Sequence, residues 1–188
     1  GFDAIKETIL SLVIQGVFAH TRSPHLNIQD FWKYSLFCGS AARFLARKLG
    51  YRIAGEAFVA GLMHDIGVLI IAQFFPKELD AIRQEQRLRG LSLVEAEHYV
   101  LAATHCEIGA WLAERWNLPE QLINAIAFHH ITSLNAEQTV AATQEQTAGT
   151  VTDDPAPLTS IVALTEWFAG HLGFKQWAQE SHESALNI

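Results

Sequence analysis

One apolar segment of the chain reads Gly61-Leu62-Met63-His64-Asp65-Ile66-Gly67 and contains an adjacent histidine and aspartate. It belongs to a longer run with apolar residues at spacings of three and four, which predicts one helix over residues 53–74 that stops before Pro76. Small residues on this helix, among them Ala57 and Ala60, predict that neighbouring helices approach it closely. The helix is therefore expected to occupy a central, buried position.

The same helical spacing recurs on both sides of this segment, without a convincing run of strand-type alternation. The sequence therefore predicts an all-α fold. Local signals set helix ends: Asp30 is a suitable N-cap, Gly90 ends a polar helix, and Ser92 with Glu95 forms a capping box. The predicted helices cover residues 3–20, 30–50, 53–74, 77–89, 92–104, 105–116, 119–130 and 158–172.

The length of 188 residues, 49% of them hydrophobic, allows one substantial core but not two comfortable domains. We therefore expect a single helical domain over residues 1–188. Between residues 131 and 157 the composition shifts to Thr, Ala, Gln, Glu, Asp and Gly, with few large apolar side chains. This change predicts a flexible surface insertion over 131–157.

Charge and cysteine content restrict the class of protein. Acidic residues outnumber basic ones 20 to 13, which argues against nucleic-acid binding through a basic surface. The longest apolar stretch falls short of the ~20 residues of a membrane span, because His64, Asp65 and Gln73 interrupt it. Cys38 and Cys106 both lie in apolar helical patterns, which predicts two buried free thiols and a reducing, cytoplasmic location.

The adjacent histidine and aspartate indicate a metal site. A buried Asp65 carboxylate must be hydrogen-bonded, paired or bound to a metal, because an unpaired buried charge is costly. Besides His64, further imidazoles come from His105 at the start of one helix and from His129 and His130 at the end of another. Imidazole and carboxylate together suit Fe, Mn, Zn or Ni, and an aspartate can bridge two ions. We predict a site for one or two divalent transition metal ions.

The last candidate ligand leaves two alternatives open. Glu166 lies on the apolar final helix, either as a surface carboxylate or as a further ligand facing the same centre. The predicted main position uses Asp65 with three histidines, and a second, weaker position adds one histidine and Glu166. The complete predicted metal-ligand set is His64, Asp65, His105, His129, His130 and Glu166.

A purely structural interpretation competes with the metal site. A single buried histidine is more typical of a hydrogen-bonded core residue than of a ligand, so the cluster can also be a satisfied polar network. The presence of several such groups on separate helices favours a common explanation. The remaining histidines are expected to be partly exposed at the surface: His20, His25, His98 and His171.

Five segments of the chain occur in a recognisable order and spacing. They are Phe31-Trp32-Lys33-Tyr34-Ser35, Ala60-Gly61-Leu62-Met63-His64-Asp65-Ile66-Gly67, Thr104-His105-Cys106-Glu107-Ile108-Gly109-Ala110-Trp111-Leu112, Trp116-Asn117-Leu118-Pro119 and Ala125-Ile126-Ala127-Phe128-His129-His130. Together they resemble the C-terminal helical part of HDOD domains, and the resemblance covers most of the chain from Phe31 to Gly170. It implies an HD-domain-like multi-helix bundle. The opening helix resembles the middle of that domain, so we expect the family's N-terminal helices to be absent from this chain.

The resemblance also implies a function. HDOD proteins are described as modules of bacterial signal transduction, so it implies a regulatory domain that works with other signalling proteins, such as response regulators or GGDEF and EAL domains. Neither a membrane nor a nucleic acid is an expected partner. The related HD phosphohydrolases and HD-GYP phosphodiesterases hold metals with the order His, His-Asp, His, His-His, Asp, which implies a metal cofactor here.

Two positions depart from that metal-binding pattern. Tyr34 stands where the first histidine is expected, and Glu166 stands at the final aspartate. A phenol with a pKa near ~10 is protonated at neutral pH and is a poorer ligand than imidazole. One side of a two-metal centre is thereby weakened.

Elements of the HD-GYP enzymes are also missing. Val68 replaces the lysine that follows His-Asp-x-Gly, which removes a cation able to stabilise phosphoryl charge, and Ile131-Thr132-Ser133 carries no GYP element. The resemblance therefore implies a regulatory domain with a remnant metal site and without assigned catalytic residues. The alternative is a metal-dependent phosphohydrolase acting on a nucleotide or cyclic dinucleotide.

Overall fold

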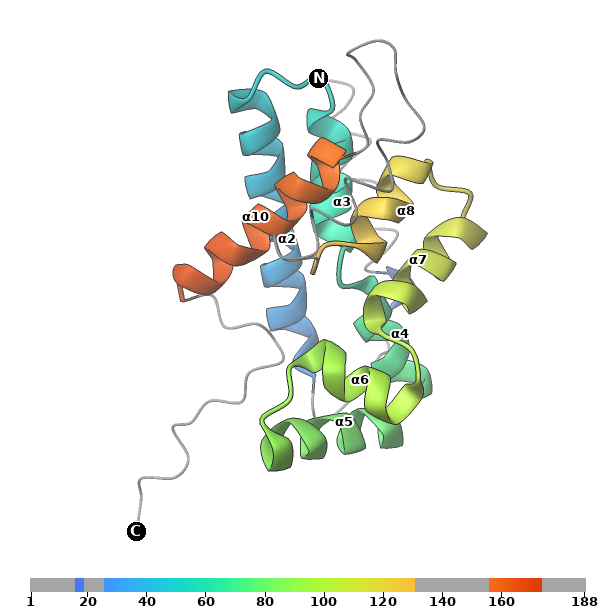
Figure 1. Cartoon of the computed structure of the whole chain (residues 1–188). Coiled ribbons are helices and arrows are strands. Elements are labelled where there is room, and N and C mark those ends of the chain that lie inside the picture. Colours follow the sequence, from blue (N-terminus) through green and yellow to red (C-terminus); the bar gives the residue numbers. More distant parts are fainter. Residues whose placement is uncertain (1–15, 19–25, 131–155, 174–188) are drawn as a thin grey trace, which may run out of the picture.

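A computed structural model of the chain describes residues 16–18, 26–130 and 156–173, and its long segments are helical (Figure 1). The all-α prediction is confirmed. The helices are α2 (Ile28–Lys48), α3 (Ala54–Met63), α4 (Ile66–Phe74), α5 (Pro76–Arg89), α6 (Leu93–Leu101), α7 (His105–Arg115), α8 (Glu120–Ala127) and α10 (Ala156–His171).

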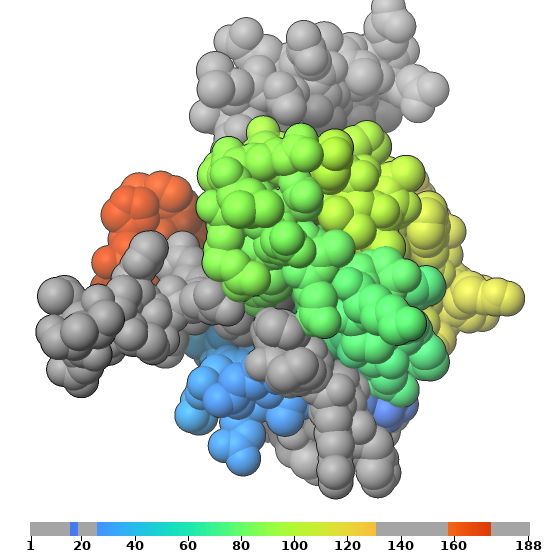
Figure 2. Space-filling model, turned by 90° about the horizontal axis from the view of Figure 1, so that it is seen from below, coloured from blue at the N-terminus to red at the C-terminus, as the bar shows by residue number. Residues whose placement is uncertain are grey.

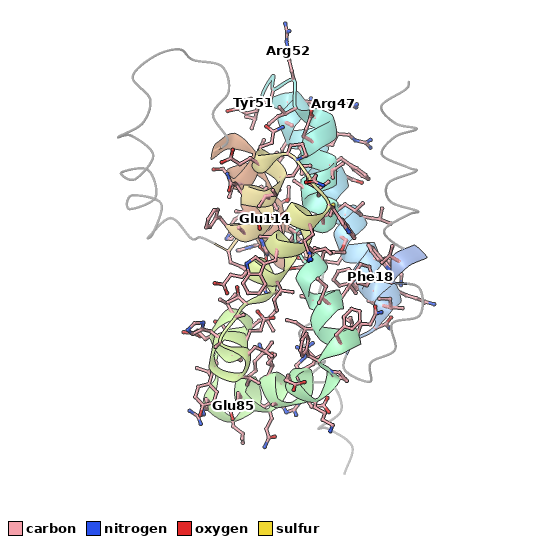
Figure 3. The ribbon with its side chains drawn as sticks, turned by 90° about the vertical axis from the view of Figure 1, so that its right-hand side faces the viewer. Phe18, Arg47, Tyr51, Arg52, Glu85 and Glu114 are labelled. Atoms are coloured by element: carbon pink, nitrogen blue, oxygen red, sulfur yellow. The ribbon has the colours of Figure 1, made fainter. Side chains whose placement is uncertain are left out.

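The helices form two packed groups that meet at the join between α3 and α4. In the first group α2 and α3 run antiparallel, and α10 crosses α2 while also contacting α3 and α8 (Figure 1). In the second group α4 packs against α5 and α7, and α5 packs against α6. Seen from below, α5 and α6 lie toward the viewer at the centre of the described part of the molecule (Figure 2). Arg52, before α3, lies at one end of the molecule and Glu85, on α5, at the other (Figure 3).

The predicted single helix over residues 53–74 is wrong in one respect, because the structure interrupts it at His64 and Asp65. Helix α3 ends at Met63, and α4 begins at Ile66, with Asp65 in its N-cap position at φ −95° and ψ 12°. Apolar periodicity continues across the break, so the pattern alone does not show it. On a regular helix adjacent side chains point about 100° apart, and the break is where both turn toward one centre.

Glycines allow α2 and α3 to touch along their backbones. A methyl group at Gly61 would lie 2.8 Å from the Cys38 carbonyl oxygen, and one at Gly39 would lie 2.7 Å from that of Phe58. Such distances are shorter than real Cβ contacts, so only glycine fits at this crossing. The expected close approach at small residues is confirmed, and Ala57 and Ala60 are fully buried.

The stretch Ala54–Phe74 passes for a membrane span by length and composition, with a mean hydropathy of 1.7. Of its most apolar 18-residue window, 78% is nevertheless buried inside the protein, as is typical of a core helix. His64, Asp65 and Gln73 do not keep this stretch below the length and composition of a span, so the expectation that it falls short is wrong, and its burial is what marks it as part of the core. The core around α4 includes Phe31, Leu62, Ile66, Leu69, Ile71, Leu79, Ile82 and Ile126.

Most predicted helix ends are confirmed within a few residues, with one correction. Helix α2 is capped by Asn27, whose side chain accepts hydrogen bonds from the backbone N–H groups of Gln29 and Asp30, so Asp30 lies in the first turn rather than at the cap. Asn27 is the cap instead of Asp30 because Asn27 has the extended backbone that a cap requires. Gly90 ends α5 in the left-handed conformation, with φ 66°.

The remaining predictions fall partly on residues that the structure does not describe. The predicted helix over 3–20, the insertion over 131–155, His20 and His25 lie outside the described residues, apart from the short piece 16–18. Residues 156–157, placed at the end of the predicted insertion, belong to α10. His98 and His171 are exposed, as expected.

Candidate metal centre

Three histidines surround the carboxylate of Asp65 at the join between the two groups of helices. Nε2 of His64 lies 3.2 Å from Asp65 Oδ2. Nε2 of His105 and Nε2 of His129 lie 3.3 and 3.4 Å from Asp65 Oδ1. All four side chains are buried. The structure thus brings together residues that are separated by up to 65 positions in the chain, at the α3–α4 break, the start of α7 and the turn after α8.

Backbone contact between α4 and α7 sets the position of His105. A methyl group at Gly67 would collide with the carbonyl oxygen of His105, so α4 and the first turn of α7 are in direct backbone contact. The start of α7 is defined by a second capping box, in which Thr104 accepts from the backbone of Glu107, and the Glu107 carboxylate accepts from the backbone of Thr104. Because Gly67 follows Asp65 by two residues, this contact places His105 beside Asp65.

An oxygen acceptor at Nδ1 orients each of the three imidazole rings. Nδ1 of His64 lies 2.8 Å from the Gly61 carbonyl oxygen, and Nδ1 of His129 lies 2.8 Å from that of Ile126. Nδ1 of His105 lies 2.6 Å from a carboxylate oxygen, Oε2 of Glu97. These oxygens only accept, so each Nδ1 carries the hydrogen and donates it. In the neutral ring the lone pair of each Nε2 is then available to a metal ion, which is the orientation of metal-ligating histidines. Without a metal, Nε2 of His105 and of His129 donates a hydrogen bond to Asp65 instead.

The facing nitrogens need a cation between them. Nε2 of His105 lies 3.4 Å from Nε2 of His129 and 3.1 Å from Nε2 of His130. Two neutral nitrogens with facing lone pairs repel one another unless a proton or a metal ion lies between them. Imidazole nitrogens beside a carboxylate suit a divalent transition ion, so the residues fit the predicted cofactor. The structure therefore contains a buried cluster that could bind a metal.

The alternative left open for Glu166 is decided in part. Its carboxylate is buried, 8% exposed, so it is not a surface carboxylate. Its Oε1 lies 3.3 Å from Nδ1 of His130, the one partly exposed histidine of the cluster. Burial raises the pKa of Glu166, against the lowering effect of the charges of His129 and His64. Glu166 thus faces the centre through His130, from helix α10.

The electrostatics of the cluster favour positive charge at its centre. Burial alone would raise the pKa of Asp65, but the charge of His64 and the hydrogen bonds from His105 and His129 hold it well below its usual range. Asp65 is therefore an ionised acceptor. Burial would lower the pKa of His129, yet the neighbouring Cys106 and Asp65 raise it to about 10.

The pKa of His130 is shifted in the opposite direction from that of His129. Burial and the charges of His129 and His105 lower the pKa of His130 to about 2. Its ring is therefore neutral at physiological pH, which is the form that binds metals. The cluster combines an ionised carboxylate with a neutral imidazole at its edge.

Two residues of the cluster were missed from the sequence. Glu97 on α6 is 1% exposed, and its Oε2 accepts from both the backbone N–H and the ring Nδ1 of His105. Cys106 Sγ lies 3.5 Å from Nε2 of His105 and 4.0 Å from Nε2 of His129. Glu97 stands beside the buried Ala96, where a carboxylate needs a partner, and Cys106 directly follows a predicted ligand. These positions were the signals that the sequence offered for the two residues.

Tyr34 and Val68, two positions that depart from the enzyme pattern, are both buried. The Tyr34 ring is buried, with its centroid 5.9 Å from that of His64, so the phenol stands beside the cluster. Val68 is buried in the apolar core and supplies no charge. Ile131-Thr132-Ser133 lies outside the described residues. Both cysteines are buried free thiols, as predicted.

Comparison with known proteins identifies relatives of the fold. The family model of the HDOD domain matches residues 1–132. A solved HDOD domain protein with unknown function from Geobacter sulfurreducens is similar with a TM-score of 0.76 and 24% identity, covering 98% of this chain and 56% of that one. A structure from Shewanella amazonensis SB2B, named "Putative phosphohydrolase", has a TM-score of 0.67 and 22% identity, covering 90% and 57%.

Two further proteins are similar to this chain. A "Putative signal transduction protein" from Marinobacter aquaeolei VT8 has a TM-score of 0.59 and 21% identity, covering 95% of this chain and 46% of that one. An uncharacterized protein of Treponema pallidum (strain Nichols) is 32% identical over 103 residues, or 54% of this chain and 20% of that protein. The chain therefore spans about half the length of the solved relatives and a fifth of the Treponema protein.

Proposed function

Because the chain belongs to the HDOD domain family, we propose that it is a regulatory domain of bacterial signal transduction that holds a divalent transition metal and does not turn over a substrate. The observation that carries this proposal is the burial of the cluster. His64 and His105 are 0% exposed, His129 is 1% exposed and Asp65 is 3% exposed. Hydrolytic metal sites keep an open position for water and substrate, whereas structural sites are closed.

The proposed role of the metal is to hold the two groups of helices in one arrangement. Its ligands come from the α3–α4 break, from the start of α7 and from the turn after α8, and His130 also contacts α10 through Glu166. Ligation there would tie these segments together at one point. Occupancy of the site would then bias how α7 and α8 sit against α3 and α4, which is a conformational output that a partner can sense.

The partners and location are proposed on the same basis. A regulatory domain without its own reaction acts on other signalling proteins, so we propose response-regulator, GGDEF or EAL proteins as its partners in the cytoplasm. The name of the Marinobacter relative is consistent with this role. Neither the cluster nor the acidic composition supplies a site for nucleic acid.

A phosphohydrolase is the second candidate, and two observations favour it. The His64–Asp65 pair and the imidazoles around it form the kind of donor set that activates water on a metal. The His130 side chain is 29% exposed, which leaves one edge of the cluster accessible. The buried Val68, however, supplies no cation to a phosphoryl group, and loss of one such electrostatic donor commonly costs about 10²–10³ in kcat.

An activity assay separates the two candidates. Purified protein is supplied in turn with Mn, Fe(II) and Ni and incubated with cyclic di-GMP beside an active HD-GYP enzyme. We expect turnover at background. Turnover above about one per second that Asp65→Ala abolishes would replace the regulatory proposal with the enzymatic one. Elemental analysis of the same samples tests the cofactor: less than about a tenth of an equivalent of any transition metal after reconstitution would refute the metal site.

A further inference from the structure

We propose that Cys106 is a metal ligand and that the centre contains a thiolate–imidazole site of Cys106, His105, His129 and His130, which takes a thiophilic ion such as Zn²⁺ in preference to Mn²⁺ or Mg²⁺. The inference rests on the proposed function, since it requires that this cluster binds a metal. It adds a ligand that the His-Asp pattern does not contain. It also names the class of metal.

The distances between the donor atoms carry the inference. A tetrahedral Zn²⁺ with Zn–N near 2.0–2.1 Å and Zn–S near 2.3 Å separates two nitrogens by about 3.3–3.4 Å, and a nitrogen from a sulfur by about 3.6 Å. Here Nε2 of His105 lies 3.4 Å from Nε2 of His129 and 3.5 Å from Cys106 Sγ. Two further edges scatter around the same values: 3.1 Å from His105 Nε2 to His130 Nε2, and 4.0 Å from Cys106 Sγ to His129 Nε2.

The four donor atoms lie in one small volume and come from two parts of the chain. Their ligand atoms lie within 4.8 Å of one another. His105 and Cys106 are the first two residues of α7, and His129 and His130 follow α8. Helices α7 and α8 pack against each other, and this contact fixes the position of one pair of ligands relative to the other. Four donors are the number that closed zinc sites use.

The two thiols of the chain differ in their surroundings, which separates a ligand from an ordinary core cysteine. Cys38 lies on α2, where burial and the charges of Asp65 and Glu166 raise its pKa well above the ordinary value. Cys106 Sγ lies 3.5 and 4.0 Å from Nε2 of His105 and His129 and shares one group of donor atoms with them, whereas neither of the two groups of donors in the described part of the chain contains Cys38. The position of Cys106 is therefore that of a ligand.

Asp65 is the competing ligand. Its Oδ1 lies 3.3 and 3.4 Å from the same Nε2 atoms of His105 and His129. With His64 and His129 it forms a second group of donors that share one centre. Oxygen and nitrogen without sulfur would favour a harder ion such as Mn²⁺ or Fe²⁺. The choice between the Cys106 face and the Asp65 face therefore decides the metal.

Cobalt titration of the whole metal-free chain tests the inference, because a Co²⁺–thiolate bond produces an intense near-ultraviolet charge-transfer band. Wild type and two variants, Cys38→Ser and Cys106→Ser, are titrated with Co²⁺, then with Zn²⁺ and Mn²⁺ in competition. We expect the band in wild type and in Cys38→Ser, and its loss in Cys106→Ser. Zn²⁺ should displace Co²⁺ where Mn²⁺ does not. Zn²⁺ affinity of Cys106→Ser should fall at least as far as the about 10–100-fold that loss of a ligand's hydrogen-bond partner costs.

The Cys38→Ser variant keeps the test decisive even if Cys106→Ser does not fold, since Cys106 is then the one thiol of the 188-residue sequence. A band in that variant supports the inference. Stoichiometric Co²⁺ binding without the band overturns the thiolate ligand and leaves the proposed metal site standing on Asp65. Absence of Co²⁺, Zn²⁺ and Mn²⁺ binding overturns the inference and the metal-dependent function together.

Discussion

Replacement of Glu97 tests how the structure holds His105 in the cluster. One buried oxygen, Oε2 of Glu97, accepts the backbone N–H of His105 at 2.9 Å and its ring Nδ1–H at 2.6 Å. Glu97→Ala removes the acceptor of both donors in the interior. In Glu97→Gln the amide oxygen can take the place of Oε2, so the hydrogen bonds stay while the negative charge is lost. The two variants therefore separate hydrogen bonding from charge.

The expected cost follows from the number of donors. A buried donor without a partner costs about 1–3 kcal/mol, so Glu97→Ala should lower the free energy of unfolding by about 2–6 kcal/mol. Hydrogen bonds to a charged acceptor are worth about 1 kcal/mol more than neutral ones, so Glu97→Gln should cost about 2 kcal/mol. Loss of the carboxylate that orients a metal-ligating histidine costs about 10–100-fold in affinity, and we expect this in both variants.

Chemical unfolding of the metal-free protein and Zn²⁺ titration of the native protein measure the two effects. Glu114→Ala is the matched control, since Glu114 is an exposed carboxylate on α7 (Figure 3) and should change neither quantity. Unfolding free energies of both Glu97 variants within about 0.5 kcal/mol of wild type, with unchanged Zn²⁺ affinity, would refute the argument. His105 would then be placed by helix packing alone.

Three further predictions concern the centre and its supports. His64→Ala and Asp65→Ala should each cost about 1–3 kcal/mol and lower the melting temperature, because each breaks a buried polar pair; unchanged melting with and without metal would contradict this. Gly67→Ala should lower the free energy of unfolding by about 1–3 kcal/mol and weaken metal binding, because the added methyl group meets the His105 carbonyl. In the control Gly170→Ala, on α10, the added methyl group meets nothing within 4 Å, so this variant should be neutral or stabilising. Equal unfolding curves for the two variants would refute the close contact. Removing a metal present at about 100 times its Kd should cost about 2.7 kcal/mol, or roughly 5–10 °C in Tm by calorimetry; no shift with a chelator would show that no ion contributes.

The amino-acid sequence alone was enough for the class of fold and for most members of the cluster. Helical periodicity and end signals such as Gly90 and the Ser92–Glu95 capping box are local, and the structure confirms them. A histidine and an aspartate at adjacent positions in an apolar helix are costly unless they are partnered. His64 and Asp65 could therefore be recognised from their positions, with partners expected on other helices, and the structure brings these partners to within hydrogen-bonding range.

Only the tertiary structure decided how those residues meet. Periodicity shows that a side chain faces the interior, but not which side chain faces it from another helix. Glu97 and Cys106 were therefore missed as members, although one holds His105 and the other lies against it. The break between α3 and α4 was missed for the same reason. Apolar residues continue through it, and its position coincides with contacts that Asp65 makes to α7 and to the turn after α8.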